Sequence, residues 1–154
     1  MSINNSFDFF IQWHLTDKCN LTCTHCYQTG EKTDEMTLPE IKDAIHEISD
    51  ALTLWMNTYG IHFSPSVNIT GGEPFLVKDI FAVLSEFKKR GFEIYLLTNG
   101  TLITKSRAQQ LSDLDVQGVQ VSIEGPREIH ESISFPATRV SAVVSKLQLH
   151  PVVL

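Results

Sequence analysis

Segments with strand-like and helix-like patterns alternate along the 154 residues of this chain, and this alternation limits the possible fold more than any other feature. Runs rich in β-branched and aromatic residues predict four strands, at 7–15, 66–70, 92–98 and 116–125. Apolar residues at helical spacing predict three helices, at 37–60, at 78–90 and from 104 onward. Strands alternating with helices form a parallel sheet through right-handed crossovers, so the sequence predicts an α/β fold. The stretches 139–149 and 151–154 fit a fourth helix and the start of a fifth strand.

The first expected helix carries signals at both ends. Thr37 and Glu40 fit a capping box, and Gly60 fits a helix stop. Its apolar face would consist of Ile41, Ile45, Ile48, Leu52, Trp55 and Tyr59. In the helix that Thr104 would cap, the inward positions would be Ala108, Leu111 and Leu114. Both tryptophans and the phenylalanines are expected in the core, and His46 at its boundary.

The formal charge of −6 argues against binding of duplex nucleic acid, because nothing concentrates Lys and Arg against phosphates. The basic run Lys88-Lys89-Arg90 falls in the last turn of an expected helix, where cations meet free carbonyls. The N-terminal stretch has no basic leader with a long apolar region, and no stretch approaches the ~18 apolar residues of a membrane span. We therefore expect a cytoplasmic protein with reduced thiols and without membrane or nucleic-acid partners.

All the cysteines, Cys19, Cys23 and Cys26, lie within eight residues, separated by three and then two residues. An odd number cannot pair fully into disulfides, and three thiolates are one short of the four ligands that close a structural zinc site. Three thiolates can instead hold three irons of a [4Fe–4S] cluster and leave the fourth iron open, which is the mark of a reactive centre. A zinc site completed by His25 or His14 is the alternative that these residues leave open.

Four motifs at the predicted strand ends, taken together, resemble the radical S-adenosylmethionine family. They are CNLTCTHCY after the first strand, NITGGEPFL at the second, LLTNGTL at the third and VSIEG at the fourth. The resemblance covers about residues 9–131 and implies that 1–154 is the N-terminal portion of that family's core domain. The implied fold is a parallel partial (β/α) barrel, truncated after about four strand–helix units. That incompleteness keeps another reading open, a non-catalytic remnant that binds a cluster at most.

The resemblance implies two cofactors, a [4Fe–4S] cluster and S-adenosylmethionine, and a role for each motif. The three cysteines would ligate the cluster. The cationic methionyl amino group would be received by Gly71, Gly72, Glu73 and Pro74. The adenine would lie beside His25 and the backbone of Tyr27. Further candidates, for contacts with the ribose or carboxylate or for lining the substrate cavity, are Asn99, Ser122 and Glu124.

Each of these segments also has a purely structural interpretation. Gly and Pro punctuate loops, so 71–74 could be an ordinary strand-to-loop turn. Asn99-Gly100 is a common turn pair, Ser122 could merely satisfy backbone groups at the strand end, and Glu124 could be a solvated surface residue. The coincidence of the Gly-Gly-Glu-Pro segment with the cysteine spacing favours the functional interpretation of both.

The implied chemistry is carried by the cofactors. A reduced cluster gives one electron to the sulfonium, which yields methionine and a 5′-deoxyadenosyl radical that takes a hydrogen atom from the substrate. The resemblance further implies an electron donor, such as flavodoxin or ferredoxin, and a substrate that is a peptide or a tetrapyrrole. The sequence itself does not choose between these substrates.

Overall fold

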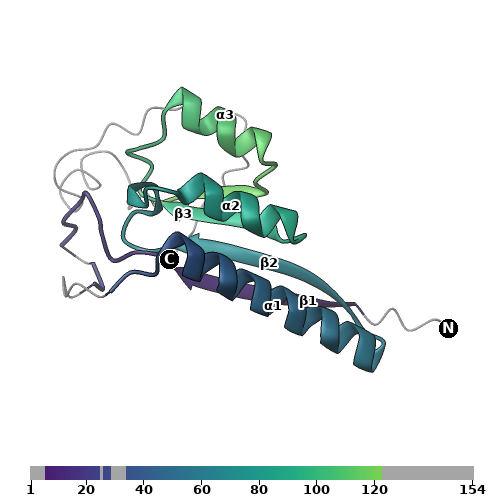
Figure 1. Ribbon diagram of the computed structural model, residues 1–154. Helices are drawn as coiled ribbons and strands as arrows, with labels where there is room; N and C mark the ends of the chain where they lie inside the picture. The colour runs from purple at the N-terminus through teal and green to yellow at the C-terminus, as the bar shows by residue number, and fades with distance from the viewer. Residues whose placement is uncertain (1–5, 25, 29–33, 123–154) are drawn as a thin grey trace.

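Four parallel strands form a sheet in the order β1-β2-β3-β4 (Figure 1). The computed structural model describes residues 6–24, 26–28 and 34–122. The strands are β1 (Ser6–His14), β2 (His62–Thr70), β3 (Glu93–Thr98) and β4 (Gly118–Val121). The parallel α/β fold is therefore as the sequence predicted, with β2 beginning earlier than expected. The predicted elements at 139–149 and 151–154 lie outside the described residues.

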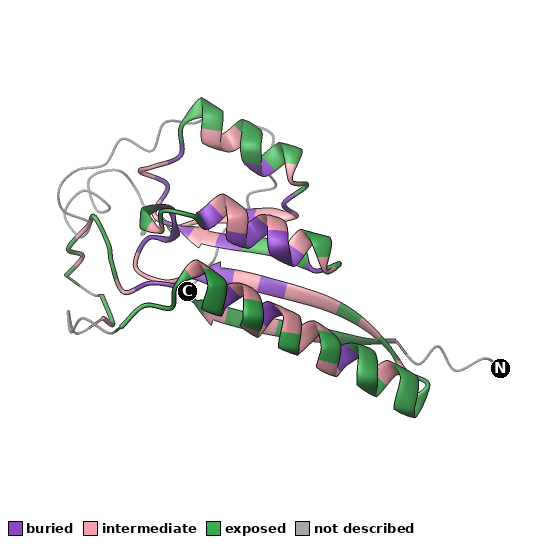
Figure 2. Ribbon diagram, in the orientation of Figure 1, coloured by how far each residue is buried: buried purple, intermediate pink, exposed green. Residues whose placement is uncertain are grey.

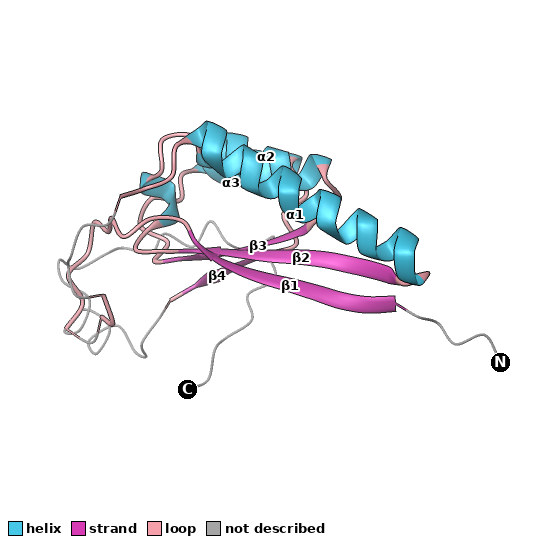
Figure 3. Ribbon diagram, turned by 60° about the horizontal axis from the view of Figure 1, so that its bottom comes forward, coloured by secondary structure: helices cyan, strands magenta, loops and turns pink. Residues whose placement is uncertain are grey.

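Three helices cover one face of the sheet, and in the described part of the chain the other face is left uncovered (Figure 3). The helices are α1 (Leu38–Tyr59), α2 (Ile80–Lys89) and α3 (Lys105–Asp113), and a short 3-10 turn, η1 (Pro74–Leu76), precedes α2. A row of register-paired residues crosses the sheet beneath the helices and consists of Trp13, Ile69, Leu96 and Val119. Within the described residues the sheet does not close into a barrel.

Buried residues alternate with more exposed ones along β3 (Figure 2), as expected for a sheet with one covered and one open face. Val67 and Ile94 are fully buried against the helices, whereas Phe10 is 60% exposed on the open face. The expectation that all phenylalanines belong to the core is thus wrong for Phe10, because its position alternates with Phe9 and Ile11, which are partly buried and pack against the core. It is also wrong for Phe7, which is 52% exposed near the start of β1.

The long helix α1 begins and ends where the sequence signals lie. The backbone N–H of Thr37 donates to Glu40 Oε2 at 2.7 Å, and Gly60 adopts a left-handed conformation with φ 64°. Its buried residues are Ile41, Ile45 and Leu52. Trp55 and Tyr59 were expected on the same buried face but are 44% and 69% exposed. The reason is length: α1 has 22 residues and α2 has 10, so the last turns of α1 extend beyond the neighbouring helix (Figure 1).

Helices α2 and α3 also follow their sequence patterns. Helix α2 begins two residues later than predicted and buries Ile80, Val83, Leu84, Glu86 and Phe87. Thr104 Oγ1 accepts a hydrogen bond from the backbone N–H of Arg107, as expected of a cap, and Leu111 is buried. In the described part of the chain, no helix combines the length and apolar character that a membrane crossing requires.

Candidate cofactor site

Three loops meet beyond the carboxyl ends of β1, β2 and β3, at one edge of the sheet (Figure 1). They comprise residues 15–28, which hold the cysteines, residues 71–74 and residues 99–101. Binding sites of parallel α/β sheets lie at this edge, where the sequence placed the candidate residues. Two of those candidates, His25 and Glu124, lie outside the described residues.

Two backbone hydrogen bonds tie the Gly-Gly-Glu-Pro segment to the start of the cysteine loop. The N–H of Gly72 donates to Thr16 O at 2.7 Å, and the N–H of Glu73 donates to Lys18 O at 2.8 Å. A Cβ on Gly72 would lie 2.3 Å from Lys18 O, and one on Gly71, where φ is 152°, would lie 2.5 Å from Thr16 O. The glycines are therefore required by the close approach of the two loops, a reason that the sequence did not reveal.

The side chain of Glu73 is completely buried and turned towards the end of β3. Its carboxylate accepts hydrogen bonds from Thr98 Oγ1 at 2.8 and 2.9 Å, from the backbone N–H of Asn99 at 2.9 Å and from that of Phe75 at 3.1 Å. These neutral donors compensate the buried charge and join the ends of β2 and β3. The contact of this carboxylate with the methionyl amino group stays a prediction. In this structure the carboxylate of Glu73 acts as a structural brace, because its hydrogen bonds hold the ends of β2 and β3 together.

The side chain of Asn99 reaches from the end of β3 to the cysteine loop. Its Oδ1 accepts from the backbone N–H of Thr101 at 2.9 Å, as in an Asx turn. Its Nδ2 lies 3.0 Å from Asn20 Oδ1 and 3.8 Å from Cys19 Sγ. Asn20 Nδ2 in turn donates to Thr101 Oγ1 at 2.8 Å. Asn99 is thus both the predicted turn residue and a contact of the first cysteine.

All three cysteines are free thiols. The backbone N–H of Leu21 lies 3.4 Å from Cys19 Sγ, and the N–H of Cys26 donates to Cys23 O at 3.1 Å. Burial raises the pKa of the Cys19 thiol, and the charge of Glu73 adds to the rise, whereas the two N–H donors oppose it. A metal cation would replace the proton on such a thiol.

The donor set fits a cluster held by three thiolates, because three free thiols share one loop and one sulfur already accepts N–H groups. Among the described residues, no three His, Cys, Asp or Glu side chains converge as they would around one metal ion. A cuboidal cluster spreads its thiolates over separate irons. The lack of three converging side chains among the described residues therefore bears on a site for a single metal ion and not on a cluster.

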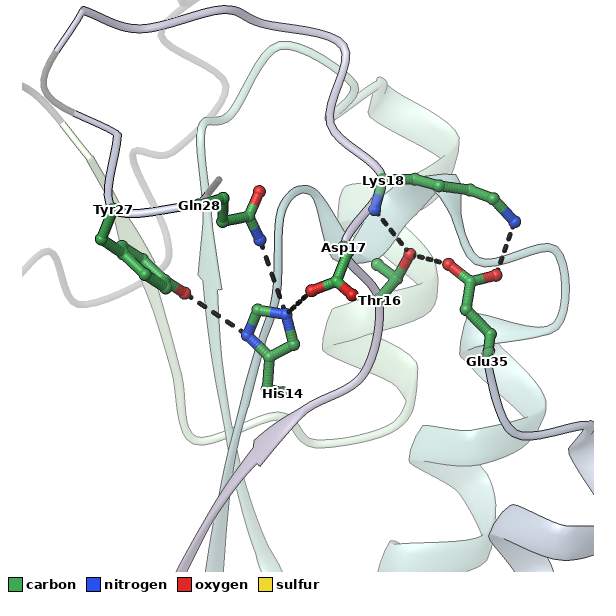
Figure 4. Close-up of polar contacts among 7 residues, drawn as sticks. All are labelled: His14, Thr16, Asp17, Lys18, Tyr27, Gln28 and Glu35. Atoms are coloured by element: carbon green, nitrogen blue, oxygen red, sulfur yellow. Dashed lines mark hydrogen bonds and ion pairs between the residues drawn. The ribbon is translucent and has the colours of Figure 1, made fainter. Parts of the chain in front are cut away.

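A second polar group lies beside the cysteine loop, at the end of β1 (Figure 4). His14 Nε2 lies 2.6 Å from Asp17 Oδ1, and His14 Nδ1 lies 3.3 Å from the hydroxyl of Tyr27. Gln28 Nε2 lies 3.5 Å from His14 Nε2. Burial raises the pKa of Tyr27, and the charges of Cys26 and Asp17 contribute. His14, the alternative zinc ligand, thus faces Asp17 and Tyr27 and ties the loop after Cys26 to the strand.

Glu35, which lies shortly before α1, is bonded to the beginning of the cysteine loop (Figure 4). Its carboxylate accepts from Thr16 Oγ1 and, at 2.5 Å, from Lys18 Nζ. The hydrogen bonds from Lys18 and Thr16 hold the pKa of Glu35 below its usual value. The beginning of the cysteine loop is therefore anchored to the segment that precedes α1.

Ser122 follows β4, and its backbone N–H donates to Thr98 O at 3.0 Å, which continues the sheet pairing. Several residues that build this edge carry no motif of their own in the sequence, namely His14 as a brace, Thr16, Asn20, Glu35 and Thr98. The only available signal was their position, directly after a strand or beside a cysteine. Polar residues in such positions are common in any α/β sheet.

Two features define the class of protein: helices on one face of an open parallel sheet, and a loop of three free thiols held at the carboxyl edge by a Gly-Gly-Glu-Pro segment. The model of the Radical SAM superfamily matches residues 13–148. The chain belongs to the radical SAM superfamily, as its motifs indicated.

Curated relatives share this core. An Fe-coproporphyrin III synthase of Methanosarcina barkeri is 31% identical over 124 residues, which cover 79% of this chain and 28% of the relative. An AdoMet-dependent heme synthase of the same organism is 32% identical over 126 residues, with 79% and 33% covered. The mycofactocin maturase MftC of Mycolicibacterium smegmatis is 29% identical over 126 residues, with 80% and 29% covered. The chain spans about a third or less of the length of these relatives.

Solved structures agree with the fold. Native anSMEcpe with bound AdoMet gives a TM-score of 0.65 at 25% identity, over 82% of this chain and 35% of that one. BtrN in complex with AdoMet and 2-DOIA gives 0.62 at 23% identity, over 78% and 48%. Streptococcus suis SuiB bound to its precursor peptide gives 0.62 at 21% identity, over 83% and 27%. The sheet is therefore part of a radical SAM barrel.

Proposed function

We propose that this chain forms the cofactor-binding part of a radical SAM enzyme, which holds a [4Fe–4S] cluster and S-adenosylmethionine. The observation that carries the proposal is the loop of three free thiols, anchored at the carboxyl edge of the sheet by the backbone of Gly72 and Glu73. Membership of the superfamily supports it, as does the AdoMet bound to the similar protein anSMEcpe.

The chain's own residues bind and orient in this proposal. Cys19, Cys23 and Cys26 ligate the cluster, and residues 71–74 receive the methionyl amino group through their carbonyls and the carboxylate of Glu73. Contacts with the adenine fall to His25 and the backbone of Tyr27, and contacts with the ribose, the carboxylate or the substrate fall to Ser122 and Glu124. The resemblance implies this last role for Asn99 as well. When bound, the reduced cluster supplies the electron that cleaves S-adenosylmethionine to methionine and a 5′-deoxyadenosyl radical.

We further propose that the substrate is a tetrapyrrole or a peptide, with flavodoxin or ferredoxin as electron donor in the cytoplasm. Relatives named as heme and Fe-coproporphyrin synthases support the tetrapyrrole. A relative named as a mycofactocin maturase, and a similar structure bound to its precursor peptide, support the peptide.

Anaerobic reconstitution of the full chain with iron and sulfide tests the cofactor assignment. We expect a brown protein with about four irons per chain, which yields 5′-deoxyadenosine from S-adenosylmethionine and dithionite. Cys23→Ala should lose both iron and product. Tightly held zinc with no uptake of iron would refute the cluster. A cluster without 5′-deoxyadenosine would identify a non-catalytic binding domain.

A further inference from the structure

The amide of Asn99 has one orientation that its neighbours permit. The backbone N–H of Thr101 can only donate, so the Asn99 atom that it contacts at 2.9 Å must be the oxygen. The backbone N–H of Asn99 is held separately by the buried carboxylate of Glu73, at 2.9 Å. With its oxygen and backbone fixed, the amide nitrogen of Asn99 is directed at the cysteine loop.

That nitrogen carries two hydrogens and has two acceptors within reach. Asn20 Oδ1 lies 3.0 Å away and Cys19 Sγ lies 3.8 Å away. The second amide group, on Asn20, is itself held by Thr101 Oγ1 at 2.8 Å. Asn20 therefore accepts one N–H of the Asn99 amide, and the other N–H faces the sulfur of Cys19.

We propose that Asn99 is a positioning residue of the cluster, which donates an N–H···S hydrogen bond to Cys19 and thereby raises the reduction potential, and that it does not contact the nucleoside. The inference rests on the cluster of the proposed function. It replaces the nucleoside contact that the resemblance implied for Asn99.

The direction of the effect follows from charge. Reduction adds one negative charge to the cluster, and some of this charge spreads onto the thiolate sulfurs. An N–H dipole aimed at a sulfur stabilises the charged form, as does the second donor on Cys19, the backbone N–H of Leu21 at 3.4 Å. Hydrogen bonds to the sulfurs are among the features that set the potentials of such clusters. Loss of the Asn99 donor should therefore shift the potential to more negative values.

The test compares the reconstituted wild-type chain with Asn99→Leu, which keeps the branched shape at Cγ but has no hydrogen-bond donor. The midpoint potential is measured by an EPR-monitored redox titration, and binding of S-adenosylmethionine by calorimetry on the oxidised cluster. We expect a more negative midpoint with an affinity for S-adenosylmethionine within about twofold of wild type, or ~0.4 kcal/mol. Thr101→Val is the matched control, because it removes a contact of Asn20 and leaves both sulfur donors in place. Its midpoint should equal that of wild type.

Each other outcome refutes a specific step. Equal midpoints in wild type and Asn99→Leu overturn the inference while leaving the proposed cluster intact. A tenfold loss of affinity for S-adenosylmethionine in Asn99→Leu, with an unchanged midpoint potential, would show that Asn99 contacts the nucleoside and not the cluster. Failure of the wild-type chain to take up iron refutes the proposed function itself. If Asn99→Leu does not fold by circular dichroism, Asn99→Ser, whose hydroxyl is too short to reach the sulfur, takes its place with the same expected shift.

Discussion

At Gly72 two backbone segments cross so closely that a side chain has no room. A Cβ would lie 2.3 Å from the carbonyl oxygen of Lys18 and 2.6 Å from its carbonyl carbon. Backbone atoms cannot move aside as the tip of a side chain can, so Gly72→Ala must separate the two loops and break the bond to Thr16 O. We expect the free energy of unfolding in urea to fall by about 3 kcal/mol.

The matched control for Gly72→Ala is Gly118→Ala. A Cβ there would meet only side-chain atoms, at 3.0 Å from Cδ1 of Tyr95, and Tyr95 is 39% exposed, so its ring can shift towards solvent. The control should cost less than ~1 kcal/mol. Equal losses in the two variants would show that the close approach at Gly72 does not exist in solution.

A substitution of Glu73 can distinguish two roles of its buried carboxylate, holding the strand ends together and contacting S-adenosylmethionine. Glu73→Gln keeps one acceptor oxygen but sets an NH₂ group among the donors of Thr98, Asn99 and Phe75. If the side chain is a brace, the free energy of unfolding should fall by about 1–3 kcal/mol. Glu93→Gln, on the exposed start of β3, is the control and should change little. Unchanged stability together with weaker binding of S-adenosylmethionine would instead make the carboxylate a ligand contact.

Between elements, an ion-pair group connects α1 and α2. Glu86 Oε1 lies 2.8 Å from His46 Nε2. The basic side chains near the Glu86 carboxylate are Lys42, His46, Lys89 and Arg90. The hydrogen bond from His46 is the largest cause of a lowered pKa of Glu86. A carboxyl pKa that is lower in the folded state stabilises the protein above the ordinary value of 4.5, and this contribution is lost as the pH falls through the folded pKa.

We therefore expect Glu86→Gln to lower the free energy of unfolding by roughly 0.5–1 kcal/mol at pH 6. The difference from wild type should narrow as the pH falls below 4.5, because the wild-type carboxylate becomes protonated there. Urea titrations at several pH values measure this. Glu47→Gln, on the exposed side of α1, should show no such pH dependence. A constant difference at every pH would mean that the loss comes from packing.

The sequence alone was enough to predict which described segments form helices and which form strands, because the signals for them are local. The helix stop at Gly60 and the cap at Thr104 depend only on nearby residues. The exposure of Trp55 and Tyr59 was not predictable in this way. Periodicity tells which residues share a face of α1, but the burial of that face depends on where the neighbouring helix ends.

For the molecule as a whole, the location of the site was predictable and its internal contacts were not. The rule that ligands bind at the carboxyl edge of a parallel sheet places Cys19 and Asn99 at the same edge. Their contact joins residues 80 positions apart, and the crossing at Gly72 depends on how far two loops approach. Such distances are set by the packing of the whole sheet, which no local pattern of residues encodes.

The contrast between the two faces of the sheet gives the last prediction. Phe87 is fully buried on the side of α2 that faces the sheet, and its ring centroid lies 5.6 Å from that of Trp13 and 5.3 Å from that of Phe92. Phe10, in contrast, is 60% exposed on the open face. Phe87→Ala should therefore cost about 3–5 kcal/mol of unfolding free energy, since it leaves a cavity. Phe10→Ala removes the same side chain and should cost less than ~0.5 kcal/mol, with weaker binding of an apolar dye. Urea unfolding compares the pair directly, and a loss above ~2 kcal/mol for Phe10→Ala would show that the open face is covered in solution.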